Sequence, residues 1–294
     1  MHTSGKLIAV LFSMAWVSTN VLAQGTTPPG GIDPALLAKA NAGNADAEFL
    51  VGAKYELGAR IPADLAQAAA WYRKAADKGD VRAQHSLGVM YEFGRGVPAD
   101  DSQATEWYRK AADRGFAPAQ FSLGLCYAHG KGVPQDYRQA LEWYGKAAEQ
   151  KNPDALLNLA YLYHNGVGVP KDEARSLDYI RRAADAGSPD AQFQLGMYYY
   201  GGEQGLQPDN ELARKWLHRS ASQGHVAAQF NYAMLLKAEP AEVYFWLSLA
   251  TPHLTGDSGQ KSKELRNTAA GRLTAQQRTQ IDEKVKNWHP VIED

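Results

Sequence analysis

The sequence predicts an all-α fold, a solenoid of about five and a half 36-residue helix-turn-helix repeats with a C-terminal capping helix. One observation is a fixed step of 36 residues shared by tyrosine, alanine and glycine. Another is that the stretch 87–115 recurs, little changed, one period earlier and one period later. A period of about 20 to 50 residues is typical of a stacked array of one supersecondary unit. The columns are Tyr55, Tyr91, Tyr127, Tyr163 and Tyr199; Ala47, Ala83, Ala119, Ala155 and Ala191; and Gly58, Gly94, Gly130, Gly166 and Gly202.

The first helix of each repeat is predicted from its apolar stripe. In the second repeat, Ala83, Leu87, Gly88 and Tyr91 fall on one face of a helix. Gly94 then ends the helix, because glycine takes the left-handed cap conformation without strain. The residues that follow are turn formers.

The second helix begins after Asp100, and Gln103 three residues later predicts an Asp-based capping box. Small residues are expected where the two helices cross, and large rings between successive hairpins. The Arg-Lys pairs of the recurring WYRKAA stretch are expected to form a solvated face. The inward residues of this helix are Ala104, Trp107, Tyr108, Ala111 and Ala112.

The N-terminus is expected to be a signal peptide, residues 1–23, because an apolar stretch precedes a Val-Leu-Ala cleavage pattern. The apolar stretch is too short and too interrupted for a membrane span. Residues 24–33 contain paired prolines and glycines and are predicted to be a flexible linker. We therefore expect an exported chain that has no membrane span after cleavage.

The repeat array is assigned to residues 34–250, and residues 251–294 to capping helices and a tail. Thr274 is predicted to cap the last helix, with Gln277 at the capping-box position and Ile281 on its inner face. An open array needs an end with a polar outer surface. The C-terminal segment is therefore expected to close the array.

The recurring pattern A…LGxxYxxGxGVxxDxxxAxxWYRKAAxxG resembles the Sel-one-like repeat, a 36-residue relative of the tetratricopeptide repeat. The resemblance covers residues 44–237, which are five whole repeats and the first helix of a sixth. It implies a right-handed α/α superhelix and, from the bacterial distribution of the family, a periplasmic location. Tyr179 stands where other repeats have tryptophan, which is ordinary drift among repeats.

The composition does not favour an enzyme, a metal protein or a nucleic-acid-binding protein. The net charge is −1, so no overall field attracts nucleic acid. The eight histidines form no common ladder, and no Cys/His/Asp/Glu set has metal-ligand spacing. Cys126, the one cysteine, is expected to be a small buried apolar residue. We therefore expect no catalytic residue, no cofactor and no metal.

A protein-binding surface is predicted on the first helices, which line the concave side of superhelical α/α arrays. On each first helix, the residues next to the core-facing positions form a second stripe that would face the concave side. The phenylalanines of this stripe can alternatively be interpreted as packing residues of the repeat consensus. Aromatic residues of the fourth and fifth repeats are better candidates, since earlier repeats lack them and aromatic rings are enriched among interface anchors. The candidate partner-binding residues are Tyr161, His164, Met197, Tyr198, Tyr200, Phe193, Glu92 and His85.

The expected function is a non-enzymatic periplasmic adaptor or inhibitor whose partner is an envelope protein or a secreted effector toxin. The family resemblance implies several such roles. They are an immunity protein that neutralises a secreted phospholipase-type toxin, a regulator of an envelope sensor kinase, and a scaffold for envelope or cell-wall assembly. It also implies a peptidoglycan- or β-lactam-active enzyme, which the absence of nucleophile and base spacing disfavours.

Overall fold

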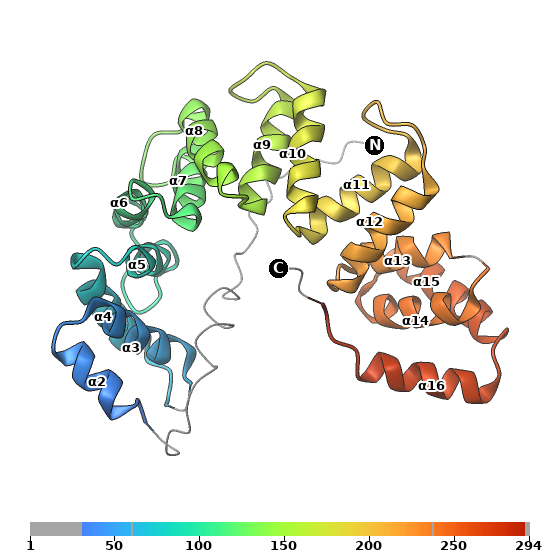
Figure 1. The fold of residues 1–294 in the computed structure, drawn as a ribbon, viewed down its shortest axis with the longest axis horizontal. Helices are drawn as coiled ribbons and strands as arrows, with labels where there is room; N and C mark the ends of the chain where they lie inside the picture. The colour runs from blue at the N-terminus through green and yellow to red at the C-terminus, as the bar shows by residue number, and fades with distance from the viewer. Residues whose placement is uncertain (1–30, 60, 237, 292–294) are drawn as a thin grey trace. The chain divides into compact units, whose positions relative to one another are not determined.

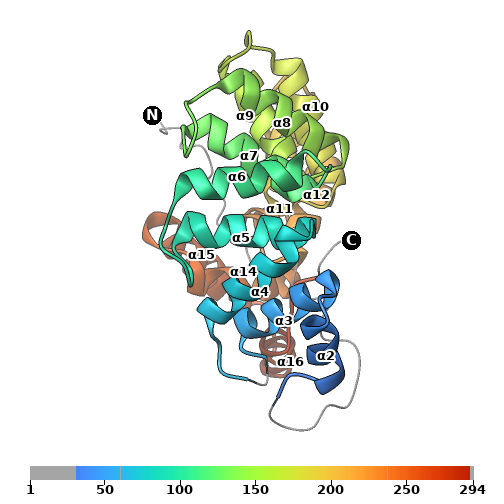
Figure 2. The same cartoon turned by 90° about the vertical axis from the view of Figure 1, so that its left-hand side faces the viewer.

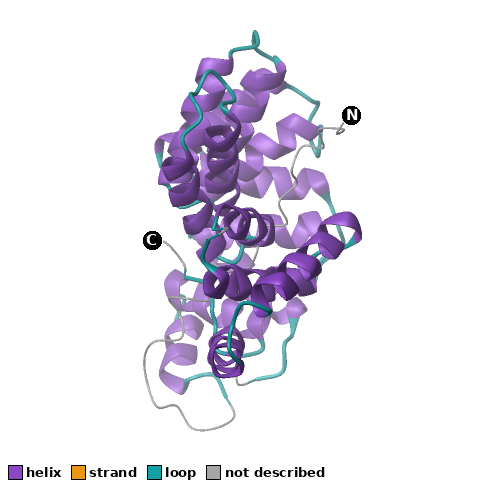
Figure 3. Cartoon of the chain, turned by 90° about the vertical axis from the view of Figure 1, so that its right-hand side faces the viewer, coloured by secondary structure: helices purple, strands orange, loops and turns teal. Residues whose placement is uncertain are grey.

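The computed structural model describes residues 31–59, 61–236 and 238–291, and within these ranges every regular element is a helix (Figure 3). The chain has the all-α, repeating helix-turn-helix fold that its 36-residue step predicts. The expected signal peptide, residues 1–23, lies outside the described residues, as does most of the expected linker. None of the described helices is long and apolar enough to cross a membrane.

Two compact units make up the chain, Met1–Pro170 and Lys171–Asp294. The first contains α2 (Pro34–Asn41), α3 (Ala45–Leu57), α4 (Leu65–Asp77), α5 (Val81–Phe93), α6 (Asp101–Ala112), α7 (Ala117–His129), α8 (Tyr137–Glu149) and α9 (Pro153–Asn165). The second contains α10 (Glu173–Asp185), α11 (Pro189–Gly201), α12 (Asn210–Ser222), α13 (Val226–Leu235), α14 (Pro240–Ala250), η1 (Thr251–His253), α15 (Gly256–Ala270) and α16 (Ala275–Lys286).

In the first unit, α3, α5 and α7 form one layer and α4, α6 and α8 the other, and the helix pairs follow one another in chain order (Figures 1 and 2). Trp107 of α6 joins the buried cluster that contains Ala68, Tyr72 and Ala75 of α4. It is 5% exposed. The prediction that large rings fill the space between successive hairpins is confirmed at this position.

The helix boundaries of each repeat follow from their caps. Gly94 ends α5 in the left-handed conformation, with φ of 64°. Asp100 caps the N-terminus of α6, and its side chain accepts a hydrogen bond from the backbone N–H of Gln103 at 3.0 Å. In a complete capping box the backbone N–H of Asp100 would donate to the side chain of Gln103. Here it donates instead to the carbonyl of Tyr91 at 2.9 Å, a bond that closes the connector between the two helices. The predicted box is therefore half formed in this repeat.

Close approach of the two helices depends on glycine at one position. A Cβ atom on Gly88 would lie 2.6 Å from the ring of Tyr108, which is shorter than any van der Waals contact allows. The same close approach recurs between Gly124 and Tyr144. The small-residue column therefore lets a fully buried tyrosine of the second helix pack closely against the backbone of the first helix.

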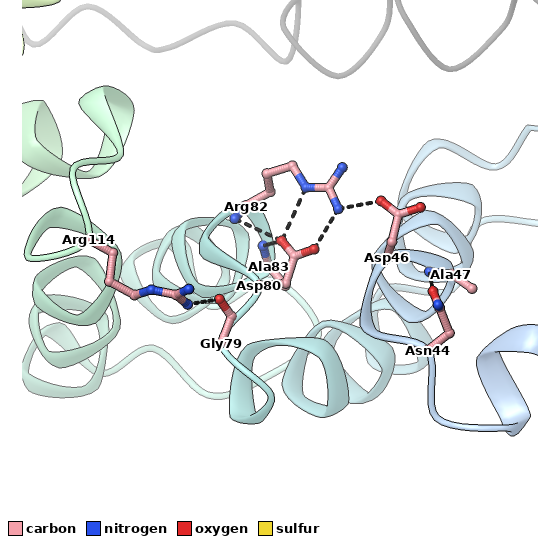
Figure 4. A network of polar contacts seen from close by, with 8 residues as sticks. All are labelled: Asn44, Asp46, Ala47, Gly79, Asp80, Arg82, Ala83 and Arg114. Carbon is pink, nitrogen blue, oxygen red and sulfur yellow. Dashed lines mark hydrogen bonds and ion pairs between the residues drawn. The ribbon is translucent and has the colours of Figure 1, made fainter.

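Polar links between the ends of neighbouring hairpins supplement the apolar core (Figure 4). Arg82 of repeat two forms ion pairs with Asp46 of repeat one at 2.6 Å and with Asp80 at 2.5 Å. Arg114 of repeat two donates to the carbonyl of Gly79 at the end of repeat one. These contacts tie repeat two to repeat one.

The arginine of the WYRKAA stretch is bound within the chain, which corrects the expectation from the sequence, whereas the lysine is exposed as expected. Arg109 of repeat two donates to the hydroxyl of Tyr127 in repeat three at 2.8 Å. Lys110 lies 3.9 Å from the centre of the Trp107 ring, as a cation–π contact. The tyrosine of the next repeat therefore accepts a hydrogen bond from the arginine, and the tryptophan of the same helix offers its ring face to the lysine.

The C-terminal helices α15 and α16 close the second unit. Thr274 and Gln277 form the complete capping box predicted for α16, and Ile281 is buried against the preceding helices. Tyr244 of α14 donates to Asp282 of α16 at 2.9 Å. The backbone N–H of Val291 donates to the carbonyl of Ser222 at the end of α12, also at 2.9 Å.

Candidate functional site

The phenylalanine column of the first helices packs on the tyrosines of the second helices. Phe49 lies 5.6 Å from the ring of Tyr72, and Phe121 lies 5.8 Å from the ring of Tyr144. Both phenylalanines are buried. The alternative interpretation as packing residues is therefore correct for these two.

His85 takes the place of phenylalanine in repeat two. Its ring lies 5.5 Å from the ring of Tyr108 and 5.7 Å from that of Phe116. Its Nε2 atom lies 3.2 Å from the hydroxyl of Ser122 in repeat three. Burial lowers the pKa of His85 to about 4, so the imidazole is neutral at pH 7. His85 thus joins repeats two and three through contacts within the chain.

Glu92 is also held within the chain. Tyr108 donates to its Oε2 atom at 2.8 Å, and Lys131 of repeat three lies 2.7 Å from its Oε1 atom. The arrangement repeats that of Glu56, which accepts from Tyr72 at 2.7 Å and pairs with Arg95 at 3.1 Å. Glu92 is therefore a polar link of the repeat stack, with both carboxylate oxygens in use.

Repeat three lacks this polar link. Ala128 stands where the glutamate stands in repeats one and two, and Val167 stands where Arg95 and Lys131 stand. Tyr144 is completely buried, and its hydroxyl has no hydrogen-bond partner among the described residues. Burial raises the pKa of Tyr144 well above its ordinary value.

The four residues of the predicted aromatic cluster belong to different units. Tyr161 and His164 lie half-buried in α9 of the first unit. Tyr198 and Tyr200 lie in α11 of the second unit. Tyr198 is half-buried and accepts a hydrogen bond from the side chain of Gln194 at 2.7 Å, whereas Tyr200 is 51% exposed.

Phe193 and Met197 of α11 both pack against the buried cluster around Leu217 and Trp246. The ring of Phe193 also stacks on His225, with ring centres 4.7 Å apart. Phe193 and Met197 are half-buried, and they support the stacking of the fifth repeat on the sixth. Of the four predicted residues in α11, Tyr200 is the one with a mostly exposed ring.

Phe93 is a candidate that the sequence analysis missed. It is the last residue of α5 and is 55% exposed, the largest exposure of any phenylalanine, tyrosine or tryptophan in the described residues. The partner-binding residues predicted for this helix are His85 and Glu92, and Phe93 lies one position after Glu92. The sequence does contain an indication of this site. Phe93 is a large apolar residue directly before the glycine cap of its helix, and it belongs to no predicted packing position of the repeat.

The chemistry available elsewhere in the described residues is limited. No group of three or more His, Cys, Asp or Glu side chains within residues 31–291, apart from the gaps at 60 and 237, could hold a metal ion. Cys126 is buried, and burial raises the pKa of its thiol to about 11. At neutral pH the thiol is therefore protonated and a poor nucleophile.

Comparisons with known proteins agree with this architecture. The Sel1 repeat profile matches residues 45–80, 81–116, 117–152, 153–188 and 189–225. A Sel1 repeat protein from Oxalobacter formigenes is 34% identical with a TM-score of 0.72, over 78% of this chain and 68% of that one. Comparison with curated proteins found no match.

Two further structures are similar to the chain. One is a protective antigen of uropathogenic Escherichia coli strains, 34% identical with a TM-score of 0.68 over 86% of this chain. The match spans 56% of the length of that antigen. The other is an immunity protein of Pseudomonas aeruginosa, 21% identical with a TM-score of 0.44, over 90% of this chain and 94% of that one. The profile matches more than half of the chain, and we conclude that the protein belongs to the Sel1 repeat family.

Proposed function

We propose that this protein is a non-enzymatic periplasmic adaptor or inhibitor that binds another protein through the exposed ends of its first helices. The Sel1 repeat fold is in general a protein-interaction scaffold. One observation supports the location of the binding surface. Three large apolar side chains in the described residues are mostly exposed, and two of them, Phe93 and Tyr200, lie in the last turn of a first helix.

The setting of Phe93 suits an interface anchor. Its neighbour Glu92 is fixed by Tyr108 and Lys131, so the helix end that carries the ring is held in place before a partner arrives. A ring presented on an ordered element loses little conformational freedom on binding. Aromatic residues, phenylalanine among them, are enriched at protein–protein interfaces.

The buried groups favour a binding role over a catalytic one. His85 and Ser122 are 3.2 Å apart, which is the spacing of a base and a nucleophile. A general base works best when its pKa lies near the working pH, and burial lowers the pKa of His85 to about 4. The rings of Tyr108 and Phe116 pack on the same imidazole. We therefore assign this pair to the packing of repeats two and three.

The proposed location rests on the sequence of the first 23 residues, with an apolar stretch before a Val-Leu-Ala pattern. N-terminal sequencing of the protein recovered from an osmotic-shock fraction tests it. We expect the chain to begin at Gln24. A chain that keeps Met1 and stays in the cytosol would contradict a periplasmic role.

Binding is tested by capturing the partner from an envelope extract with the full chain and then measuring affinities of variants. Phe93→Ala and Tyr200→Ala are expected to weaken binding by about 2 kcal/mol, roughly thirtyfold, at whichever ring is an anchor. Glu106→Ala on α6 is the control, because that side chain is 55% exposed and pairs with Lys110 of its own helix. Circular dichroism confirms that each variant is folded.

The identity of the captured protein separates the roles that remain. A secreted phospholipase-type effector would indicate an immunity protein, and a sensor kinase or cell-wall protein would indicate a regulator or scaffold. If both ring variants bind like the parent while Glu106→Ala does not, the partner lies on the second helices. The proposed surface would then be wrong even if the protein is a binding protein.

A further inference from the structure

We propose that a pocket at the end of α13 binds the C-terminal residue of a partner chain, with its apolar side chain in the pocket and its carboxylate on Arg272. The pocket lies within the second unit, between α13, α14 and α15. Neither Phe93 nor Tyr200 lines this pocket. Either this site or the surface proposed above can therefore fail without the other.

The pocket lies where one first helix is shorter than the rest. The first helices α3, α5, α7, α9 and α11 each have 13 residues, whereas α13 has 10 and ends at Leu235. One helical turn is about 3.6 residues, so α13 lacks its last turn. Ala233 and Met234, in the last turn that α13 does form, line the pocket together with Pro240, the first residue of α14.

The size of the pocket fits one large side chain. It is an open hollow with a volume of about 210 Å³. A protein cavity of about 150 Å³ is enough to bind benzene. Its walls are mainly apolar, with Val243 and Leu247 from α14 and Leu265 and Ala269 from α15. A leucine or phenylalanine side chain is therefore the size and polarity that the pocket favours.

Arg272 adds charge to this apolar pocket. It is the one charged residue in the lining, and no ion pair to it lies within the described part of the chain. Its side chain is exposed, so the guanidinium is available to a ligand. Guanidinium groups recognise carboxylates through two parallel N–H···O bonds.

The combination points to a chain terminus. In a C-terminal residue the apolar side chain and the carboxylate branch from a single Cα atom, so one residue can reach both the pocket and its charged rim. Thr268, the one hydroxyl in the lining, donates to the carbonyl of Glu264 at 2.9 Å and is already occupied. Arg272 is therefore the side chain that would select for negative charge.

The test uses the full chain and a peptide, Gly-Ser-Gly-Ser-Gly-Ser-Phe, labelled at its N-terminus and followed by fluorescence anisotropy. We expect the free acid to bind, and the C-terminal amide to bind at least about tenfold more weakly. Replacing the terminal phenylalanine by serine should weaken binding by a similar factor. Equal binding of the acid and the amide, or no saturable binding of the acid below about 1 mM, would overturn the proposal.

Variants of exposed residues locate the site without disturbing the core. Arg272→Gln should weaken the free acid about tenfold and leave the amide unchanged, because the amide has no charge to lose. Thr268→Trp should block the pocket and abolish binding of both peptides. Lys263→Gln, an exposed positive charge of α15 outside the lining, is the matched control and should bind like the parent. If Lys263→Gln weakens binding as much as Arg272→Gln, the attraction is general charge and the assigned site is wrong.

Discussion

Repeats two and three share one framework and differ in what they bury in it. Each has a 13-residue first helix, a glycine under a fully buried tyrosine, and a tryptophan in the hairpin interface. In repeat two the tyrosine is Tyr108, which contacts His85 on one side and donates to Glu92. In repeat three it is Tyr144, which contacts Phe121 and has Ala128 where the carboxylate would be.

The difference shows which parts of the motif are required for the fold. The glycine, the ring and the caps are present in both repeats, because close helix packing needs them. The carboxylate and the cation that pairs with it are present in one repeat and absent in the next, so the stack forms without them. A buried hydroxyl without an acceptor costs about 1–3 kcal/mol, which the packing of repeat three offsets.

The largest expected effect is the one that the two repeats share. Tyr108→Ala and Tyr144→Ala should each lower the free energy of unfolding by about 3–5 kcal/mol, since each leaves a cavity the size of a ring. Urea titration of the full chain, followed by circular dichroism, measures both. If one of them costs less than about 1 kcal/mol, the two tyrosines do not have equivalent packing roles.

A second experiment removes the polar link from repeat two. Glu92→Ala should destabilise the chain by about 1–3 kcal/mol, because the buried hydroxyl of Tyr108 loses its acceptor and Lys131 loses its partner. Urea titration against Glu106→Ala, an exposed glutamate of the same repeat, gives the matched comparison. Equal values for the two variants would mean that the link contributes no more than a surface pair.

The stability of the chain is expected to fall at acid pH because of His85. In the folded chain burial lowers the pKa of His85 to about 4, whereas in the unfolded chain it is about 6.5. The unfolded state therefore binds more protons between these values, and stability falls as the pH drops from 6.5 to 4. His85→Phe, which copies repeat three, should remove this loss, because phenylalanine does not titrate. The loss is expected to be on the order of 1–2 kcal/mol, since the imidazole is partly exposed and solvent weakens the effect of burial.

Urea titrations of the parent and of His85→Phe at a series of pH values between 4 and 7 measure that loss. Glu92 and Ser122 face the same region, and they are left unchanged in the variant. The two chains should differ most at the acid end of the series. Parallel curves would show that His85 does not titrate differently in the folded and unfolded chains.

The smallest effect separates the two repeats most sharply. Tyr108→Phe should cost about 1.5 kcal/mol, because it removes a hydrogen bond to a carboxylate. Tyr144→Phe should be neutral to within about 0.5 kcal/mol or stabilising, because the hydroxyl it removes has no partner among the described residues. Differential scanning calorimetry of both variants tests the pair. A loss in Tyr144→Phe as large as in Tyr108→Phe would show that the hydroxyl of Tyr144 does have an acceptor.

The candidate site was less predictable than the fold. The binding surface predicted on the first helices included His85 and Glu92, and both make contacts inside the stack. The predicted surface did not include Phe93, which lies one position after Glu92 and is therefore rotated from it by about 100° around the helix axis. Tyr200 was selected and is exposed. A repeat pattern reports which residues recur, and recurrence alone does not separate a packing ring from an exposed one.

The sequence by itself determined the helix-turn-helix repeat, its length and its caps. Each of these depends on residues close together in the chain, such as Gly94 after a first helix and Asp100 before a second. The tertiary structure decided which polar side chains are used inside the stack. Arg109 meets Tyr127 18 residues later, and Lys131 meets Glu92 39 residues earlier. The free surface is what remains after such contacts between hairpins form, so it depends on packing that no local pattern contains.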